Sequence, residues 1–212
     1  MRAKRLLLAG RGAAAGALLV AAMTVGCSEA ATPVAPSTTA VDSGLLGDPS
    51  LGAQIAAVRE ATAQFHDVNV AIAAGYPDPT GRLCDQTPAG GMGIHSGNFA
   101  LMAADVNPLV PEVLLYEPKN GGGFRLVGVE YIQFVFLRNP TTGVVAPWTA
   151  STPWPTDYQV VTPTPQLFGQ TFQGPMPGHI PGMPWHWDLH AWIWANNPSG
   201  MFAQWNPTVS CQ

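Results

Sequence analysis

Two histidines and an aspartate within five residues form the densest group of chemically active side chains in this sequence. His186, Asp188 and His190 lie in the run from Pro184 to Trp194, which also holds four of the seven Trp residues. Because so many aromatic side chains are costly to leave in water, we expect this run to be partly buried. Imidazole nitrogens and carboxylates bind transition metals, so the run is a candidate metal site.

The secondary structure of this run decides which of its side chains can share an ion. In a helix, His186 and His190 would lie on one face, but Trp residues would surround the helix. In a strand, His186, Asp188 and His190 share one face, and every residue on the other face is apolar. The strand is therefore the better interpretation. It puts His186 and His190 about 13 Å apart, too far for one ion, and leaves Asp188 with either His as the usable pair.

Further ligands must come from elsewhere in the chain. Glu130 is the best candidate, because the hydrophobic run 124–138 predicts a buried strand and a buried carboxylate needs a partner. Regular alternation would place Leu126 on the same face as Glu130. His95 and His179 lie in Gly- and Pro-rich segments, predicted loops of the kind that often carry functional groups. The predicted metal ligands, a nitrogen and oxygen set suited to zinc, iron, manganese or copper, are His95, Glu130, His179, His186, Asp188 and His190.

Two other interpretations of these residues stay open. Glu130 and a histidine could form an acid–base pair without a metal. Alternatively, the Trp-rich strand is part of the core and its histidines are structural hydrogen-bonding groups. The sequence contains no Gly-x-Ser-x-Gly motif, no phosphate-binding loop of the Walker type and no dinucleotide fingerprint, so it does not indicate the reactions that use them.

A helix and an antiparallel sheet are the elements that must position these residues. Apolar residues recur at helical spacing from Leu51 to Tyr76, with Ser50 or Asp48 as the N-cap. The β-rich runs 112–117 and 124–138 flank a Gly-rich segment and predict a hairpin.

The segment 139–184 contains ten Pro and cannot be a regular helix or a central strand over most of its length. We expect it to wrap the surface, with short elements near 158–161 and 166–172. The predicted fold class is α+β: an N-terminal amphipathic helix packed on an antiparallel sheet, with a proline-rich wrapping segment.

The N-terminal residues predict export. Basic residues precede an apolar segment at 13–25, which is typical of a signal peptide, and we assign residues 1–26 to it. Thr24-Val25-Gly26 before Cys27 predicts a lipoprotein box, with lipid on Cys27 anchoring the protein to the outer face of the membrane. The alternative is cleavage shortly after Cys27 and secretion. Residues 27–47 predict a disordered tether, and residues 48–212 a single folded domain.

Cysteine count and charge restrict the partners. With Cys27 lipidated, Cys84 and Cys211 remain as a pair in an oxidising compartment, and we predict a disulfide between them. Without the signal peptide the chain has a net charge near −8 and no basic patch, so nucleic acid is not an expected partner.

Three blocks of sequence resemble a family of secreted actinobacterial proteins of unknown function. They are Pro111–Pro118, Leu126–Tyr131 and Asp188–Trp194, the last continuing through Asn206-Pro207. The resemblance covers roughly residues 50 to 212 and implies an exported, single-domain protein. The middle block is also similar to a Gly-Val-Glu-Tyr-like run in the oil-body-associated proteins of plants and their microbial relatives, which carry a similar pair of hydrophobic strands.

These observations predict an exported cell-envelope protein that binds a metal ion or a small ligand at a His/Glu/Trp site. Its expected partners are the membrane, through the lipid anchor, and that metal or small molecule. One alternative is a metal-dependent extracellular enzyme, either a hydrolase or an oxidoreductase. The other is a structural envelope protein without a site.

Overall fold

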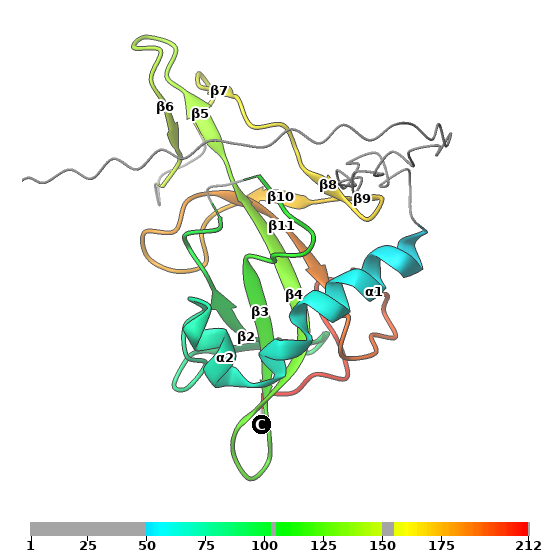
Figure 1. The fold of residues 1–212 in the computed structure, drawn as a ribbon. Helices are drawn as coiled ribbons and strands as arrows, with labels where there is room; N and C mark the ends of the chain where they lie inside the picture. Colours follow the sequence, from blue (N-terminus) through cyan, green and yellow to red (C-terminus); the bar gives the residue numbers. More distant parts are fainter. Residues whose placement is uncertain (1–49, 103–104, 150–154, 212) are drawn as a thin grey trace, which may run out of the picture. The chain divides into compact units, whose positions relative to one another are not determined.

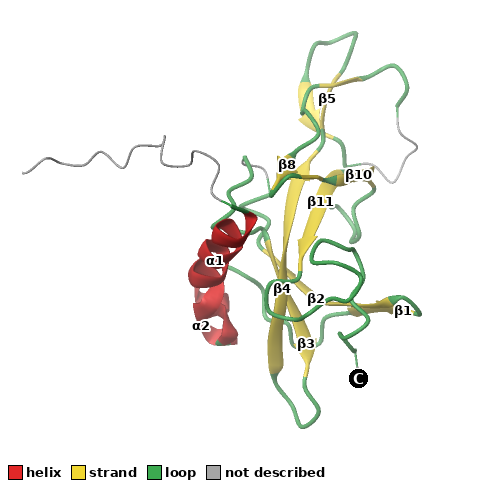
Figure 2. Cartoon of the chain, turned by 90° about the vertical axis from the view of Figure 1, so that its right-hand side faces the viewer, coloured by secondary structure: helices red, strands yellow, loops and turns green. Residues whose placement is uncertain are grey.

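The computed structural model describes residues 50–102, 105–149 and 155–211. The predicted signal peptide, Cys27 and the predicted tether lie outside these residues. Figures 1 and 2 show a large antiparallel sheet with helices on one of its faces. The α+β class predicted from the sequence is confirmed. None of the helices in the described ranges has the length and apolar character needed to cross a membrane.

The helical segment has three parts: α1 (Leu51–Thr62), the 3-10 helix η2 (Ala63–His66) and α2 (Val68–Ala73). Ser50 caps α1 as predicted, since its hydroxyl accepts a hydrogen bond from the Ala53 amide. The prediction of one continuous helix was wrong. Asp67 takes an extended conformation, and its carboxylate accepts a 2.9 Å hydrogen bond from the Asn69 amide, which starts a second helix there.

The main sheet has six strands in the order β1-β2-β3-β4-β11-β10, and every neighbouring pair is antiparallel. It curls into a half-barrel. The predicted hairpin and the predicted Trp/His strand are confirmed as β3–β4 and β11. The strand bounds are β1 (Cys84–Thr87), β2 (Gly90–Gly97), β3 (Val113–Pro118), β4 (Phe124–Phe134), β10 (Gln173–Met176) and β11 (His186–Ala191).

The proline-rich segment contributes two small sheets. One has the order β6-β5-β7 and the other pairs β8 with β9. The hairpin of β5 and β6 extends beyond the end of the main sheet (Figure 1). The predicted short elements near 158–161 and 166–172 are confirmed as β7 and as the pair β8 and β9. The bounds of the strands in the two small sheets are β5 (Phe136–Arg138), β6 (Val145–Pro147), β7 (Gln159–Val160), β8 (Gln166–Leu167) and β9 (Gln170–Thr171).

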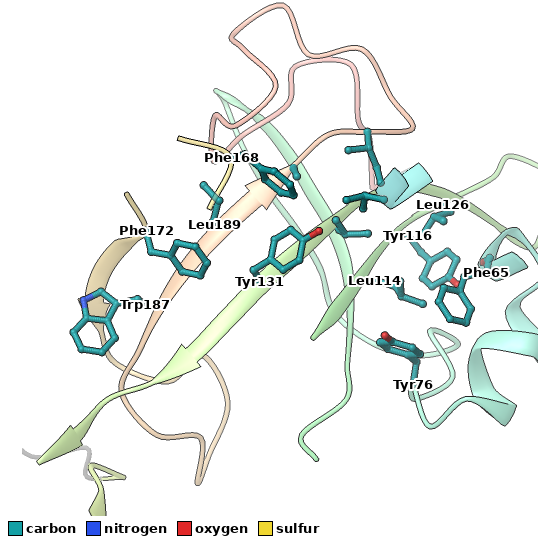
Figure 3. Close-up of a cluster of buried hydrophobic side chains, with 14 of the residues drawn as sticks. Phe65, Tyr76, Leu114, Tyr116, Leu126, Tyr131, Phe168, Phe172, Trp187 and Leu189 are labelled. Carbon is teal, nitrogen blue, oxygen red and sulfur yellow. Dashed lines mark hydrogen bonds between the residues drawn. The ribbon is translucent and has the colours of Figure 1, made fainter. Parts of the chain in front are cut away.

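The helices cover one face of the sheet, and the larger hydrophobic core lies there (Figure 3). Trp187 and Leu189 from β11 belong to it, as the predicted apolar face of that strand requires. The Tyr116 hydroxyl donates a 2.7 Å hydrogen bond to the Phe65 carbonyl oxygen, which ties η2 to β3. The Arg59 side chain donates a 2.8 Å bond to the Ile193 carbonyl oxygen. The opposite face of the sheet is therefore free to carry polar groups.

A β-bulge changes which residues of β4 share a face. Leu115 pairs with Gly128 and Tyr116 with Leu126, so Val127 is an extra residue in β4. Leu126 consequently packs in the helix-side core, and Val127 lies in the smaller cluster on the other face. The prediction that Leu126 shares a face with Glu130 was wrong, because regular alternation does not continue through a bulge.

The segment before β3 contains two strands rather than a loop. β1 and β2 form a hairpin, and His95 lies in β2. The prediction of a loop at His95 was wrong, because glycine serves close strand packing here. A Cβ atom on Gly93 would lie 2.6 Å from the Tyr116 carbonyl oxygen, and the residue has a φ of +81°. His95 is therefore fixed by a strand and not by a mobile turn.

The predicted disulfide between Cys84 and Cys211 is present. It links β1 to the last described residue, across a sequence separation of 127 residues. We expect the Cys84→Ser/Cys211→Ser variant to lose about 5 kcal/mol of unfolding free energy in the chain-entropy model. Urea unfolding of the oxidised protein and of the variant measures this difference. Equal midpoints would show that the crosslink contributes nothing to stability.

Glu112, just before β3, is buried, and its carboxylate accepts a 3.1 Å hydrogen bond from the Ile132 amide. Burial raises the pKa of Glu112 from 4.5 to about 7. The folded protein thus holds this proton more tightly than the unfolded chain does. As a result, stability falls as pH rises from about 4.5 to about 7, by an amount on the order of 3 kcal/mol.

We expect Glu112→Gln to remove this contribution, because the amide oxygen still accepts from Ile132 and carries no charge. The variant should match the wild type at pH 4.5 and be more stable at pH 8. Chemical unfolding of both proteins at the two pH values provides the test. A stability difference of the same size at both values would contradict the assignment.

Candidate metal centre

Three side chains from three strands meet on the face of the sheet opposite the helices. His95 comes from β2, Glu130 from β4 and His190 from β11. His95 Nε2 lies 3.6 Å from Glu130 Oε2, and His190 Nε2 lies 3.8 Å from Glu130 Oε1. One ligand atom from each residue lies within 4.8 Å of the other two. We call these residues the His95–Glu130–His190 cluster.

Strand register brings Glu130 and His190 together. His190 is the direct partner of Glu130 in the β11–β4 ladder, and Val113 is the partner of Glu130 on β3. Directly opposed residues in an antiparallel pair point to the same face, with Cβ atoms about 4.5–5.5 Å apart. The contact is therefore set by backbone hydrogen bonding and does not depend on loop conformation.

His95 reaches Glu130 across the intervening strand β3. The sheet is curled, which brings side chains from β2 and β4 toward each other over β3. Gly97 and Val113 continue the register row of Glu130 and His190 across β3 and β2. A Cβ atom on Gly97 would lie 2.8 Å from the Met102 Cε atom, so the glycine leaves room for the Met102 side chain in this row.

Asp85 lies behind His95. Its Oδ2 is 3.6 Å from His95 Nδ1, on the side of the ring away from Glu130. Histidines that bind metals usually have a carboxylate or carbonyl at the second ring nitrogen, which fixes the tautomer and the ring orientation. Asp85 follows Cys84 directly, so the disulfide restrains the strand that carries it. At 3.6 Å the contact is longer than a hydrogen bond, and it places a carboxylate on the Nδ1 side of the ring while Nε2 faces Glu130.

The polar atoms of the cluster are buried without hydrogen-bond partners. Within the described parts of the chain, no hydrogen bond of normal geometry reaches His95 Nε2, either carboxylate oxygen of Glu130, or either ring nitrogen of His190. Leaving one buried polar group unpaired costs about 1–3 kcal/mol, and more when the group is charged. Each of the three residues of the cluster contributes such a cost to the free energy of folding. A cation between them would satisfy all of these facing atoms together.

The pKa shifts favour the uncharged form of each cluster residue when no cation is present. Burial raises the pKa of Glu130 well above 4.5, and the neighbouring Asp188 carboxylate adds to the shift. Burial also lowers the pKa of His95 to about 4 and that of His190 well below 6.5. The histidines are therefore neutral at physiological pH, which is the form that binds metals.

The spacing of the cluster suits a transition metal. An ion about 2.1 Å from each ligand atom would see the 3.6 and 3.8 Å pairs at angles of about 120–130°, wider than the tetrahedral angle. Two imidazoles and a carboxylate form a ligand set found in catalytic zinc sites and in non-haem iron sites. Such a set leaves at least one coordination position open.

The other predicted ligands lie beside the cluster. Asp188 is buried two residues from His190, on the same face of β11, and its carboxyl adjoins that of Glu130. Burial raises the pKa of Asp188 to about 6, and neither of its carboxylate oxygens has a hydrogen-bond partner of normal geometry within the described residues. His186 Nδ1 lies 3.2 Å from the Pro184 carbonyl oxygen, and its ring packs edge-on against that of His179 at 4.9 Å. His186 and His190 thus belong to separate groups, as the strand spacing predicted.

The aromatic residues of the run support the cluster. The Trp192 ring stacks on His190 with a centroid distance of 6.1 Å, and its Nε1 donates a 2.6 Å hydrogen bond to the Ala203 carbonyl oxygen. A Cβ atom on Gly128 would lie 3.3 Å from this Trp192 ring and 2.9 Å from the Ala191 carbonyl oxygen. The glycine therefore allows Trp192 to close against the sheet beside His190.

A pocket of about 920 Å³ opens beside the cluster. His95 and Glu130 contribute to its wall, together with Asp85 and His179. Its volume lies within the range of small-molecule sites, about 300–1,000 Å³. A metal ion held by the cluster would be accessible to a molecule in this pocket.

Sequence reasoning missed two parts of the site. Asp85 was not among the predicted residues, because it was expected in a loop and has no recognisable motif around it. Its position next to a disulfide cysteine was the one available signal. The pocket was also missed, because its walls come from segments that meet only through the curl of the sheet.

Comparison of the chain with models of protein families, with curated proteins and with solved structures gave no match. The resemblances noted in the sequence therefore stay predictions. The case for function rests on the geometry of the site.

Proposed function

We propose that this protein binds one divalent transition-metal ion through His95, Glu130 and His190, and that a small molecule in the adjacent pocket coordinates this ion. Zinc and iron fit the ligand set best, and manganese and copper are further candidates. The protein then acts as a metal-dependent small-molecule-binding protein.

One observation carries this proposal: the facing atoms of the cluster are buried and lack hydrogen-bond partners within the described residues. A polar network kept for stability alone would satisfy its own donors and acceptors. Two histidines and a carboxyl group whose ligand atoms all lie within 4.8 Å of one another instead match the needs of a cation. The pocket beside His95 and Glu130 supplies the access that an open coordination position requires.

Elemental analysis tests the metal directly. The disulfide-bonded protein is stripped with chelator and dialysed against Zn²⁺, Fe²⁺, Mn²⁺ or Cu²⁺ in separate samples. We expect one ion per chain for at least one metal, lost in a His95→Ala/His190→Ala variant that keeps its fold by circular dichroism. His66→Ala, which changes an exposed histidine on the helical side, is the matched control. Failure of every metal to bind stoichiometrically would overturn the proposal.

A metal-dependent enzyme is the second candidate function. The observation in its favour is that three protein ligands leave an open position facing a pocket, as in catalytic zinc sites. Zinc-loaded protein can be tested on p-nitrophenyl esters, and iron-loaded protein for oxygen consumption. Turnover that disappears in Glu130→Gln would favour the enzyme. Tight binding of a molecule that is recovered unchanged would favour the binding protein.

The disulfide supports the proposal that the domain works outside the cytoplasm, because such crosslinks persist in oxidising compartments. Lipid attachment at Cys27 is tested by fractionation. We expect Cys27→Ser to move the protein from the membrane fraction to the medium. Continued membrane retention would contradict lipidation.

A further inference from the structure

The pocket beside the cluster has an apolar interior. Buried thioether and aliphatic side chains form much of its wall, and each is less than a tenth exposed. They come from β2, β3, β4 and two loops, so the lining is assembled from distant parts of the chain. These residues are Met92, Met102, Val113, Ile132 and Met183.

The mouth of the same pocket carries exposed apolar side chains. Leu83, Phe99 and Ile180 are 78%, 46% and 48% exposed, and all three line the pocket. They lie on three separate connections: before β1, after β2 and between β10 and β11. Large apolar side chains that gather around one opening mark a binding site, since scattered surface residues would not converge in this way. We call these three residues the pocket rim.

The charges of the lining argue against an anionic ligand. Arg82 is the single Lys or Arg among the described lining residues, and its Nε already donates to the Asp78 carbonyl oxygen. Asp85 adds a carboxylate to the same wall. Apart from Arg82, a phosphate or carboxylate would find no lysine or arginine among the described lining residues to pair with it.

We propose that the natural ligand is a small, uncharged and predominantly apolar organic molecule that enters over the pocket rim and fills the pocket next to the metal ion. This inference rests on the proposed function for the role of the metal. The apolar lining and rim exist without it, so the ligand class can be tested separately.

A matched series of ligands tests the charge preference. The neutral fluorescent probe N-phenyl-1-naphthylamine is bound first, in chelator-treated and in zinc-loaded protein. It is then displaced with 1-octanol, octanoate or octylammonium, which share a chain length and differ in charge. We expect 1-octanol to displace the probe at a concentration at least about tenfold lower than either ion. Displacement by either ion at an equal or lower concentration would overturn the inference.

Rim substitutions locate the binding. We expect the triple variant Leu83→Ser/Phe99→Ser/Ile180→Ser to weaken probe binding by about tenfold or more, since the ligand loses apolar contact at the mouth. Leu51→Ser is the matched control, because Leu51 is 43% exposed and lies on α1, outside the lining of both described pockets. Unchanged probe affinity in the rim variant would overturn the inference, even if metal binding is intact.

The two proposals fail in different ways. Probe binding and octanol preference in chelator-treated protein, without stoichiometric metal in any sample, would leave the ligand class standing and remove the metal. Stoichiometric metal with no probe binding would support metal binding and overturn the proposed ligand class. With both present, line broadening of octanol proton NMR signals in Mn²⁺-loaded but not zinc-loaded protein would place the ligand next to the ion.

Discussion

Glu130→Gln is expected to abolish the stabilisation of this protein by metal ions. Glu130 lies between the two histidine nitrogens and supplies the one negative charge of the cluster. A metal ion at about 100 times its Kd stabilises the wild type by about 2.7 kcal/mol. For a domain of this size that raises the Tm by roughly 5–10 °C.

The variant should show almost none of this shift. Loss of a residue that only hydrogen-bonds to a metal ligand can weaken metal affinity by up to about 100-fold, so we expect loss of a charged ligand to weaken it by at least that factor. The same metal concentration then raises the Tm of the variant by roughly 1 °C. Glu112→Gln is the matched control, because Glu112 is also a buried glutamate but lies outside the cluster. Thermal melts with and without metal measure both. A full shift in Glu130→Gln would remove Glu130 from the site.

Metal affinity is expected to rise with pH through the titration of Glu130. Burial holds the pKa of this carboxyl well above 4.5, so a bound cation must displace its proton. Affinity should increase about tenfold per pH unit while the carboxyl is protonated. The histidines contribute no slope in the same range, because His95 has a pKa of about 4 and that of His190 lies well below 6.5.

Titration calorimetry in buffers of different protonation enthalpy measures the protons released on binding. We expect net proton release, up to about one proton per metal ion, over the pH range in which the carboxyl is protonated. Affinity independent of pH would show that Glu130 is already ionised.

The same pKa shift has the opposite sign for the stability of chelator-treated protein. Since the folded state holds the Glu130 proton more tightly than the unfolded chain does, stability falls as pH rises above 4.5. A bound cation pairs with the carboxylate and removes that cost. The stabilisation by metal should therefore be larger at pH 8 than at pH 5.

The strand period of the Trp/His run carried most of what the sequence predicted about the site. Alternation placed His186, Asp188 and His190 on one face and the apolar residues on the other, and the structure has β11 in that form. Glu130 was found through a general rule, since a carboxylate inside a hydrophobic strand needs a partner. Neither argument could supply the register that sets Glu130 opposite His190.

Two features of the sequence led to wrong local predictions for physical reasons. Glycines around Gly93 suggested a loop, whereas they allow β2 to approach β3 closely. The bulge at Val127 shifted the alternation of β4, and the adjacent Gly128, a residue type that often marks a bulge inside a strand, was the signal that the sequence reasoning did not use. The contact between His95 and Glu130 depends on the curl of the whole sheet, which no local pattern contains.

Because the three proposed ligands lie on separate strands, the chain must fold before it can bind a metal ion. His95, Glu130 and His190 lie far apart along the chain and meet only after β2, β3, β4 and β11 have paired. An unfolded chain therefore offers no local motif that could capture an ion. If the chain binds a metal as proposed and is exported before it folds, as its N-terminus predicts, it would acquire the ion only where it folds, outside the cytoplasm.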